Sequence, residues 1–297
     1  MTTSRDAINW RLILTTAIGP LIWGSTYVVT TELLPPDRPY WAALFRCLPA
    51  GLILIAITGF RLPLRRDALR LLILSLLNIG IFQALFFVAA YRLPGGLAAV
   101  MGAVQPLIVM LLIWWVDRVA PTTLAWLAAF LGVVGMAVLL LGPSARWDML
   151  GVAAALGGAA CMGLGTFLTR RWRLSLPVTA LTGWQLLAGS LVLLPLALFV
   201  DPALPALTIR NVMGYTYLCL FGSVIAYSLW FRAASKISPA AVSSLALLSP
   251  LAAVILGWVF LGQALTVRTA IGFALVLISI IGVQLTARNN DSSQSRS

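Results

Sequence analysis

The sequence predicts an all-α integral membrane protein whose ten transmembrane helices form two inverted five-helix repeats. Three observations lead to this prediction. First, 61% of the 297 residues are hydrophobic, only 9% are charged and the mean hydropathy is +1.01, which is far from the composition of a soluble domain. Second, apolar stretches of about 20 residues, long enough to cross the hydrocarbon core as helices, recur along the chain. Third, the two halves of the chain are weakly similar to each other.

Proline, glycine and charged residues divide the apolar stretches and set the predicted helix ends. In the first half we expect helices near residues 11–31, 40–59, 69–90, 95–115 and 122–141. In the second half we expect them near residues 149–170, 178–199, 211–231, 239–260 and 267–287. The predicted domains are therefore a first repeat (1–146), a second repeat (147–288) and a polar tail (289–297) that we expect to be disordered.

Basic residues predict the orientation. An even number of helices places both termini on one side, and if that side is the cytoplasm, fourteen of the twenty basic residues lie in inner segments. The positive-inside rule therefore favours cytoplasmic termini in a bacterial inner membrane. No A-x-A-like cleavage site closely follows the first apolar run, so we expect that run to remain as the first helix.

The similarity between the halves follows a nearly constant spacing. Shifts of 139 to 144 residues align Gly24 with Gly163, Arg46 with Gln185, Phe87 with Phe231, Pro106 with Pro250 and Gly132 with Gly272. Because each repeat has an odd number of helices, the second repeat must enter the membrane from the opposite side. Inverted repeats are typical of secondary transporters, which bind substrate near mid-membrane where the repeats meet. A duplication in a protein without transport activity is the alternative.

Polar side chains in the middle of these helices are candidates for a substrate site, because a polar group facing lipid is costly. The repeat-related candidates are Trp23 with Met162, Arg46 with Gln185, Gln83 with Tyr227, and Gln105 with Ser249. Asn78 and Ser244 are further candidates, as are Tyr27 and Trp184, although such residues also serve as packing or interhelical contacts.

Two matched prolines are candidate hinges. Pro106 and Pro250 follow Gln105 and Ser249 directly in helices 4 and 9. Proline removes a backbone donor and clashes with the preceding turn, which frees carbonyl groups for a ligand or for bending. A static kink is the alternative.

Arg46 is the one basic residue that we expect inside the membrane, about six residues, or ~9 Å, below the outer start of helix 2. One interpretation is structural: Arg46 bonds helix-end carbonyls or pairs with Glu32 or Asp37 on the outer side. The other is functional: the guanidinium attracts a substrate carboxylate.

Small residues predict close contacts rather than chemistry. Gly132 with Gly135, and Gly272 with Gly282, predict close packing in helices 5 and 10, away from the cavity. The three cysteines, Cys47, Cys161 and Cys219, lie in apolar segments without the spacing of a disulfide framework or a metal site, and we interpret them as packing residues.

The sequence also excludes several functions. It contains no His, and every Asp or Glu falls in a loop or at a helix end, so neither a proton relay nor an acidic anchor for a polycation is visible within the membrane. Catalytic sets, metal ligands and phosphate-binding loops are missing too, so we expect no enzyme activity and no cofactor. The basic residues sit in short loops, which argues against nucleic acid. We therefore expect uniport or weak coupling, with Glu32 or Asp117 as possible coupling groups.

The stretch "IWGSTYVVTTELLPPDRPYWAALFRCLPAGLIL" resembles the EamA-type branch of the drug/metabolite transporter superfamily, as do "AYRLPGGLAAVMGAVQPLIVML" and "AASKISPAAVSSLALLSPLAAVILGWVFLGQALT". Within it the chain looks most like the YddG-type exporters of aromatic amino acids. This resemblance implies ten helices, a central cavity lined by helices 1, 3, 4, 6, 8 and 9, and export of small metabolites. Where the family often has a Lys in helix 1 and a Glu after "FLG", this chain has Thr30, Thr31 and Gln263.

These observations together predict an exporter of small metabolites, with aromatic or apolar amino acids as substrates, that works by alternating access as a monomer in the lipid bilayer. A multidrug or nucleotide-sugar carrier is an alternative within the same class. A membrane scaffold without transport activity is an alternative of a different class.

Overall fold

The computed structural model describes residues 10–93, 101–141, 148–261 and 266–294, and within these ranges the ordered elements are all helical. The helices of the first half are α1 (Trp10–Gly24), α2 (Thr26–Leu33), α3 (Pro39–Ile57), η1 (Arg65–Asp67), α4 (Ala68–Ser75), η2 (Leu76–Gly80), α5 (Ile81–Arg92), α7 (Gln105–Asp117) and α8 (Thr123–Leu140). Those of the second half are α9 (Met149–Trp172), α10 (Val178–Phe199), α11 (Ile209–Cys219), η3 (Leu220–Ile225), α12 (Ala226–Ala234), α13 (Pro239–Leu245), α14 (Leu248–Leu261) and α15 (Val267–Gln294).

These helices form the ten membrane segments expected from the sequence. In the described residues, nine helical stretches are long and apolar enough to span a bilayer, and α7 is a shorter apolar helix. Residues 95–100 of the predicted fourth helix lie outside the described ranges, so only its later part, α7, is seen. The all-α fold of two inverted five-helix repeats is thereby confirmed.

Several segments predicted as continuous helices are interrupted. Segment 1 breaks at Ser25, between α1 and α2, and segment 9 breaks at residues 246–247, between α13 and α14. At the second break, the amides of Leu247 and Ser249 bond to carbonyls three residues earlier. Pro250 lacks the N–H that would bond to the carbonyl of Ala246, and its ring clashes with that carbonyl, which accounts for a break at this point.

Segments 3 and 8 each contain a π-helical turn that the sequence did not predict. The turns are η2 (Leu76–Gly80) and η3 (Leu220–Ile225). A shift of 144 residues carries the first residue of η2 onto the first residue of η3, so the two turns occupy equivalent places in the repeats. π-turns are rare and often lie at functional sites.

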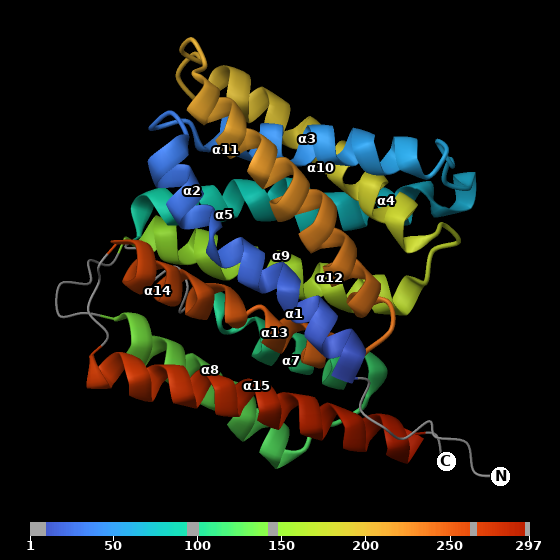
Figure 1. The fold of residues 1–297 in the computed structure, drawn as a ribbon. Helices are drawn as coiled ribbons and strands as arrows, with labels where there is room; N and C mark the ends of the chain where they lie inside the picture. Colours follow the sequence, from blue (N-terminus) through green and yellow to red (C-terminus); the bar gives the residue numbers. More distant parts are fainter. Residues whose placement is uncertain (1–9, 94–100, 142–147, 262–265, 295–297) are drawn as a thin grey trace.

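The packing of the helices obeys the same repeat relation. Segment 1 (α1) packs on α12 and α14, and its counterpart α9 packs on α5 and α7. The self-related pairs are α3 with α10 and α8 with α15. Figure 1 shows α8 and α15 side by side along one edge of the bundle, and it shows that α1 begins and α15 ends at the same end of the molecule.

Glycines bring α8 and α15 into close contact, as predicted. A Cβ added at Gly132 would lie 2.6 Å from Ser279 Oγ, and one at Gly272 would lie 2.6 Å from the backbone nitrogen of Leu139. The two contacts are related by a shift of 140 residues. The pair lies away from the cavity described below and supports the bundle from one side.

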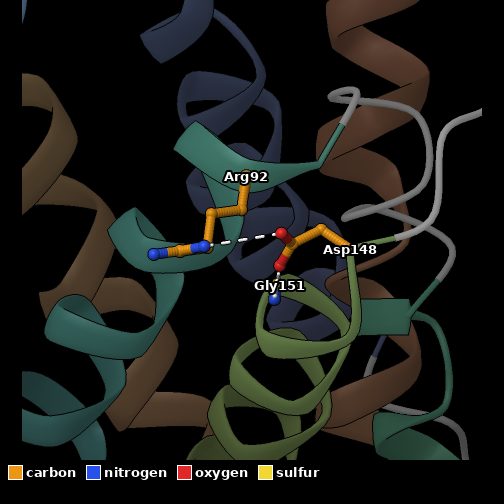
Figure 2. Close-up of polar contacts among 3 residues, drawn as sticks. All are labelled: Arg92, Asp148 and Gly151. Carbon is orange, nitrogen blue, oxygen red and sulfur yellow. Dashed lines mark hydrogen bonds and ion pairs between the residues drawn. The ribbon is translucent and has the colours of Figure 1, made fainter.

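A carboxylate joins the two repeats where the first ends and the second begins. Asp148 accepts a hydrogen bond from the amide of Gly151 at 2.7 Å, which caps α9, and its other oxygen lies 3.4 Å from the guanidinium of Arg92 at the end of α5 (Figure 2). A Cβ at Gly151 would meet the side chains of Arg92 and Leu93 at 2.9 and 2.7 Å. The start of α9 is therefore held tightly against the end of α5.

Two smaller predictions have different outcomes. Cys47, Cys161 and Cys219 are free thiols, and Cys47 and Cys219 pack in the main hydrophobic core. The tail differs from the prediction, because α15 continues through residues 289–294, which we expected to be disordered. An established helix extends at low cost even through polar residues. Residues 295–297 lie outside the described ranges.

Candidate functional site

A cavity of about 180 Å³ lies where the two repeats meet. Its walls come from segments 1, 3, 4, 6, 8 and 9, the set that the resemblance implied, and from segment 2 through Arg46. The residues that line it are Trp23, Thr26, Arg46, Phe82, Gln83, Phe86, Ala89, Gly102, Ala103, Gln105, Ala155, Gly158, Ala159, Met162, Tyr227, Trp230, Ala246, Leu247, Ser249 and Pro250.

The "WGST" stretch of segment 1 builds one wall. The indole Nε1 of Trp23 donates to the carbonyl of Gly222 in η3 at 2.9 Å, and the hydroxyls of Ser25 and Tyr217 lie 2.7 Å apart. At Gly24 an added Cβ would lie 2.5 Å from the carbonyl oxygen of Ser249, so only glycine allows α1 to approach α14 this closely. Trp23, Gly24 and Ser25 therefore connect segment 1 to segments 8 and 9 around the break at Ser25.

Arg46 is buried and faces the cavity. Its Nη2 donates to the carbonyl of Gly222 at 3.1 Å, and its guanidinium carbon lies 5.8 Å from the ring centre of Tyr227. Among the described residues neither Glu32 nor Asp37 pairs with it. The predicted pairing with an outer acid is therefore wrong, and the carbonyl that Arg46 contacts belongs to a π-turn within segment 8 rather than to a helix end.

The floor of the cavity is aromatic. Trp23 lies 5.1 Å from Tyr227 and 5.3 Å from Trp230, between ring centres, and Tyr227 stacks on Phe231 at 5.7 Å. The amide of Gln83 donates to the hydroxyl of Tyr227 at 3.2 Å. Since Gln83 and Tyr227 are equivalent residues of the two repeats, this bond crosses the pseudo-two-fold axis.

The structure brings together most of the residues singled out from the sequence. The predicted residues that line the cavity are Trp23, Arg46, Gln83, Gln105, Met162, Tyr227, Ser249 and the candidate hinge Pro250. Those that do not line it are Asn78, Gln185, Ser244 and the other candidate hinge, Pro106. The side chain of Tyr27 lies outside the described part of the structure, and Trp184 donates instead to the carbonyl of Arg61 at 2.9 Å.

The polar residues outside the cavity connect helices. Asn78 in η2 donates to Gln185 in α10 at 2.7 Å, with both side chains fully buried. Ser244 donates to the carbonyl of Ala241 and accepts from Gln284 of α15 at 3.2 Å. Pro106 lies in the first turn of α7, where its missing N–H costs no helical bond. Neighbouring helices provide hydrogen-bond partners for some or all of the polar atoms of Asn78, Gln185 and Ser244. Polarity alone therefore wrongly indicated that these residues line the cavity.

Four lining residues with aromatic or polar side chains were missed: Thr26, Phe82, Phe86 and Trp230. The shift of 144 residues that pairs Gln83 with Tyr227 also pairs Phe86 with Trp230. Two aromatic residues at equivalent positions were therefore a usable signal.

A larger hollow, of about 440 Å³, lies at the other end of the bundle, among the ends of α7, α9 and α15 and the start of α13. Arg170, Arg171 and Arg173 line it, and Arg171 pairs with Asp117. These arginines are among the basic residues expected on the inner side, which accounts for their position without a ligand. The smaller cavity holds the polar groups that the repeats bring together, so we take it as the functional site.

Comparison with known proteins fits this architecture. The sequence model of the EamA-like transporter family matches the chain twice, over residues 10–141 and 149–285. The chain belongs to the EamA-like transporter family. It is accordingly a multi-pass membrane transporter, and its relatives are transporters rather than enzymes.

Curated relatives match this EamA transporter over most of its length. Protein PecM of Dickeya dadantii (strain 3937) is 41% identical over 268 residues, covering 90% of each chain. The inner membrane transporter YedA of Escherichia coli (strain K12) is 28% identical over 271 residues, covering 89% of this chain and 88% of YedA. One crystal structure, 17% identical, superposes with a TM-score of 0.80 over 94% of this chain and 98% of that one, and shows that the fold is shared.

Proposed function

We propose that this EamA transporter exports small metabolites, with aromatic and other apolar amino acids as the leading substrates, through the cavity between its repeats. The observation that carries the proposal is the lining of that cavity. Rings of Trp23, Phe82 and Phe86 offer an apolar surface, and the guanidinium of Arg46 stands beside them. Such a lining suits a molecule with an apolar body and one carboxylate.

Transport by alternating access is the mechanism that we propose. The cavity lies toward the end of the bundle away from the start of α1, among the later part of α5 and the earlier part of α9. α13 lies between this cavity and the larger hollow at the other end of the bundle; each of its residues is buried, and Phe231 beside it is fully buried. With the termini in the cytoplasm, this arrangement corresponds to an outward-facing state.

The same proposal includes location and coupling. The basic residues support a bacterial inner membrane with both termini cytoplasmic, and the inner membrane location of YedA supports the first part. The chain has no His, and no Asp or Glu lines the described cavity, which favours uniport or weak coupling. We propose that the protein acts as a monomer, because both repeats of a single chain line the cavity.

A flux assay tests the proposal. Purified protein in liposomes should move radiolabelled phenylalanine faster than empty vesicles, with a rate that saturates as the concentration rises. Threonine and methionine serve as further substrates. Failure to move any of the three would refute the substrate class, and flux without saturation would indicate a pore rather than a carrier.

The alternatives have less support from the cavity. A carrier of cationic drugs would need an acidic group among the lining residues, where the described set has none, and a nucleotide-sugar diphosphate would meet Arg46 as its one cation. Competition of phenylalanine flux by a cationic dye or by a nucleotide sugar, stronger than by methionine, would favour these carriers.

A further inference from the structure

The cavity contains hydrogen-bond donors that have no acceptor. Arg46 Nε, Gln105 Nε2 and Trp230 Nε1 have no hydrogen-bond partner among the described residues, and the three side chains are 6%, 6% and 0% exposed. All three line the same cavity. A buried donor without an acceptor is costly, and the cost is greater for a charged group.

The acceptors near these donors are few and partly occupied. The carbonyl of Gly222 already accepts from both Trp23 and Arg46, and the hydroxyl of Tyr227 accepts from Gln83. No carboxylate lines the described cavity. The charge of the site is therefore one-sided: Arg46 is the cation of the described lining, and the side-chain oxygens there belong to neutral groups such as Thr26, Gln105 and Ser249.

We propose that the cavity recognises its substrate through an anionic oxygen group, a carboxylate on an aromatic or apolar body, and that the substrate's ammonium contributes little to binding. This inference rests on the proposed function, because it takes the cavity as the transport route. A carboxylate has four lone-pair sites and can accept from several donors at once, and a guanidinium contact would be charge-assisted. An ammonium would stand close to Arg46 with no acidic partner.

Two analogues of phenylalanine separate the contributions of its charged groups. 3-Phenylpropanoate keeps the carboxylate and lacks the amine, whereas phenethylamine keeps the amine and lacks the carboxylate. In competition with radiolabelled phenylalanine, we expect 3-phenylpropanoate to inhibit flux about as well as unlabelled phenylalanine. Phenethylamine should be weaker by about tenfold or more, because it forgoes the charge-assisted bonds.

Substitutions at Arg46 connect the preference to this residue. Arg46→Gln should weaken inhibition by 3-phenylpropanoate about tenfold or more while leaving inhibition by phenethylamine unchanged or improved. Arg46→Lys keeps the charge and should retain part of the preference. Trp184→Phe is the matched control, because Trp184 precedes Gln185, the repeat counterpart of Arg46, but does not line the cavity. If Arg46→Gln does not fold, the competition by the two analogues on the wild-type protein still decides.

A binding measurement separates this inference from the proposed function. The shift in melting temperature of the purified protein with each analogue does not depend on flux. If phenylalanine is transported but phenethylamine competes as well as 3-phenylpropanoate, the inference is overturned and the proposed function stands. If no amino acid is transported but only 3-phenylpropanoate raises the melting temperature, the inference stands and the amino acid substrate is wrong.

Discussion

The carbonyl of Gly222 organises the polar side of the cavity at the level of single residues. It lies in the π-turn η3 and accepts from Trp23 and from Arg46, at 2.9 and 3.1 Å. A wide turn leaves carbonyls less tightly engaged with their own helix, so they can accept from neighbours. One backbone oxygen thus positions the only cation of the described cavity and links three membrane segments.

Asp201 gives a prediction about stability. Its carboxylate accepts from the amide of Trp41 at 2.9 Å and so caps α3, whose own preceding residue, Arg38, provides no side-chain cap. Asp201→Ala should lower the free energy of unfolding in detergent by about 0.5–2 kcal/mol, the usual loss of a helix cap. Glu32→Ala, at an exposed acid of α2, is the control and should change it little. Equal losses in the two variants would contradict the capping role.

The charge of Asp201 is expected to make the stability of the protein depend on pH. Burial raises the pKa of Asp201, whereas hydrogen bonds from the backbone amides of Trp41 and Tyr40 and the positive charge of Arg38 act to lower it. Because this pKa is higher in the folded protein than in the unfolded chain, protonation of Asp201 stabilises the fold. The stabilisation is fully present below the ordinary carboxyl pKa and is lost as the pH rises through the pKa of the folded protein. Asp201→Asn keeps a hydrogen-bond acceptor without a charge, so it should lose less stability than Asp201→Ala. It should also abolish the increase in the free energy of unfolding at low pH that protonation of Asp201 provides. Unfolding measured from about pH 4 to 7 checks both expectations.

The sequence located residues of the cavity where chemistry and repeat position agreed. Gln83 with Tyr227 and Gln105 with Ser249 were found because both members of each pair carry polar groups in mid-helix, and both members line the cavity. Asn78 and Ser244 were chosen for polarity alone and Gln185 as the counterpart of Arg46, and all three bond to neighbouring helices instead. Polarity indicates that a side chain avoids lipid, but it does not tell whether that side chain meets substrate or another helix.

At the scale of helices, the contact between α8 and α15 predicts unequal effects at two equivalent glycines. A Cβ at Gly272 would meet the backbone of Leu139 at 2.6 Å, whereas one at Gly132 would meet the hydroxyl of Ser279, which can rotate away. Gly272→Ala should therefore lower the free energy of unfolding by roughly 1–3 kcal/mol, as overpacking does. Gly132→Ala should cost less. Thermal unfolding of both variants in detergent tests this, and an equal or reversed order would show that the helices adjust freely.

The helices themselves were easier to predict than their interruptions. Apolar length sets the membrane segments, and the bounds of α8, α9, α10 and the start of α15 fall within a few residues of those expected. The break at Ser25 and the turns η2 and η3 involve single turns of helix, which leave the average hydropathy unchanged. Only the prolines at 106 and 250 gave a local signal: Pro106 lies in the first turn of α7, and Pro250 lies in the first turn of α14, just after the break at residues 246–247.

At the scale of the whole molecule, the cavity is asymmetric although the fold is symmetric. Central pairs such as Trp23 with Met162 contribute both members to the lining. Away from the centre only one member lines it: Ala155 does, whereas its counterpart Thr16, by the shift of 139 residues, is fully buried on the side that is closed in the proposed outward-facing state. If the repeats exchange conformations, the closed half opens and Thr16 takes the place of Ala155.

Cysteine accessibility tests this exchange. In a variant with the three native cysteines replaced, Ala155→Cys should react with a membrane-impermeant thiol reagent from the side facing the cavity. Thr16→Cys should react only from the opposite side, and roughly tenfold or more faster during transport than at rest, because turnover populates the other state. Mass measurement of the labelled protein in vesicles of each orientation gives both rates.

The control for that experiment lies between α8 and α15. Ala129 is 1% exposed and packs in the interface that supports the bundle, so Ala129→Cys should stay unreactive from both sides. If Thr16→Cys is as unreactive as Ala129→Cys while flux continues, the closed half does not open and the transport cycle follows another route.

The two π-turns also bear on how the two repeats evolved. Each is defined by hydrogen bonds between residues five apart rather than four, and the two lie at equivalent positions in repeats that now share little sequence. An irregularity of this kind is more simply inherited once than acquired twice at the same place. It was then already present in an ancestral single unit of five helices, before duplication. Such an ancestor would have had to insert into the bilayer in both directions and to assemble as an antiparallel pair of identical chains.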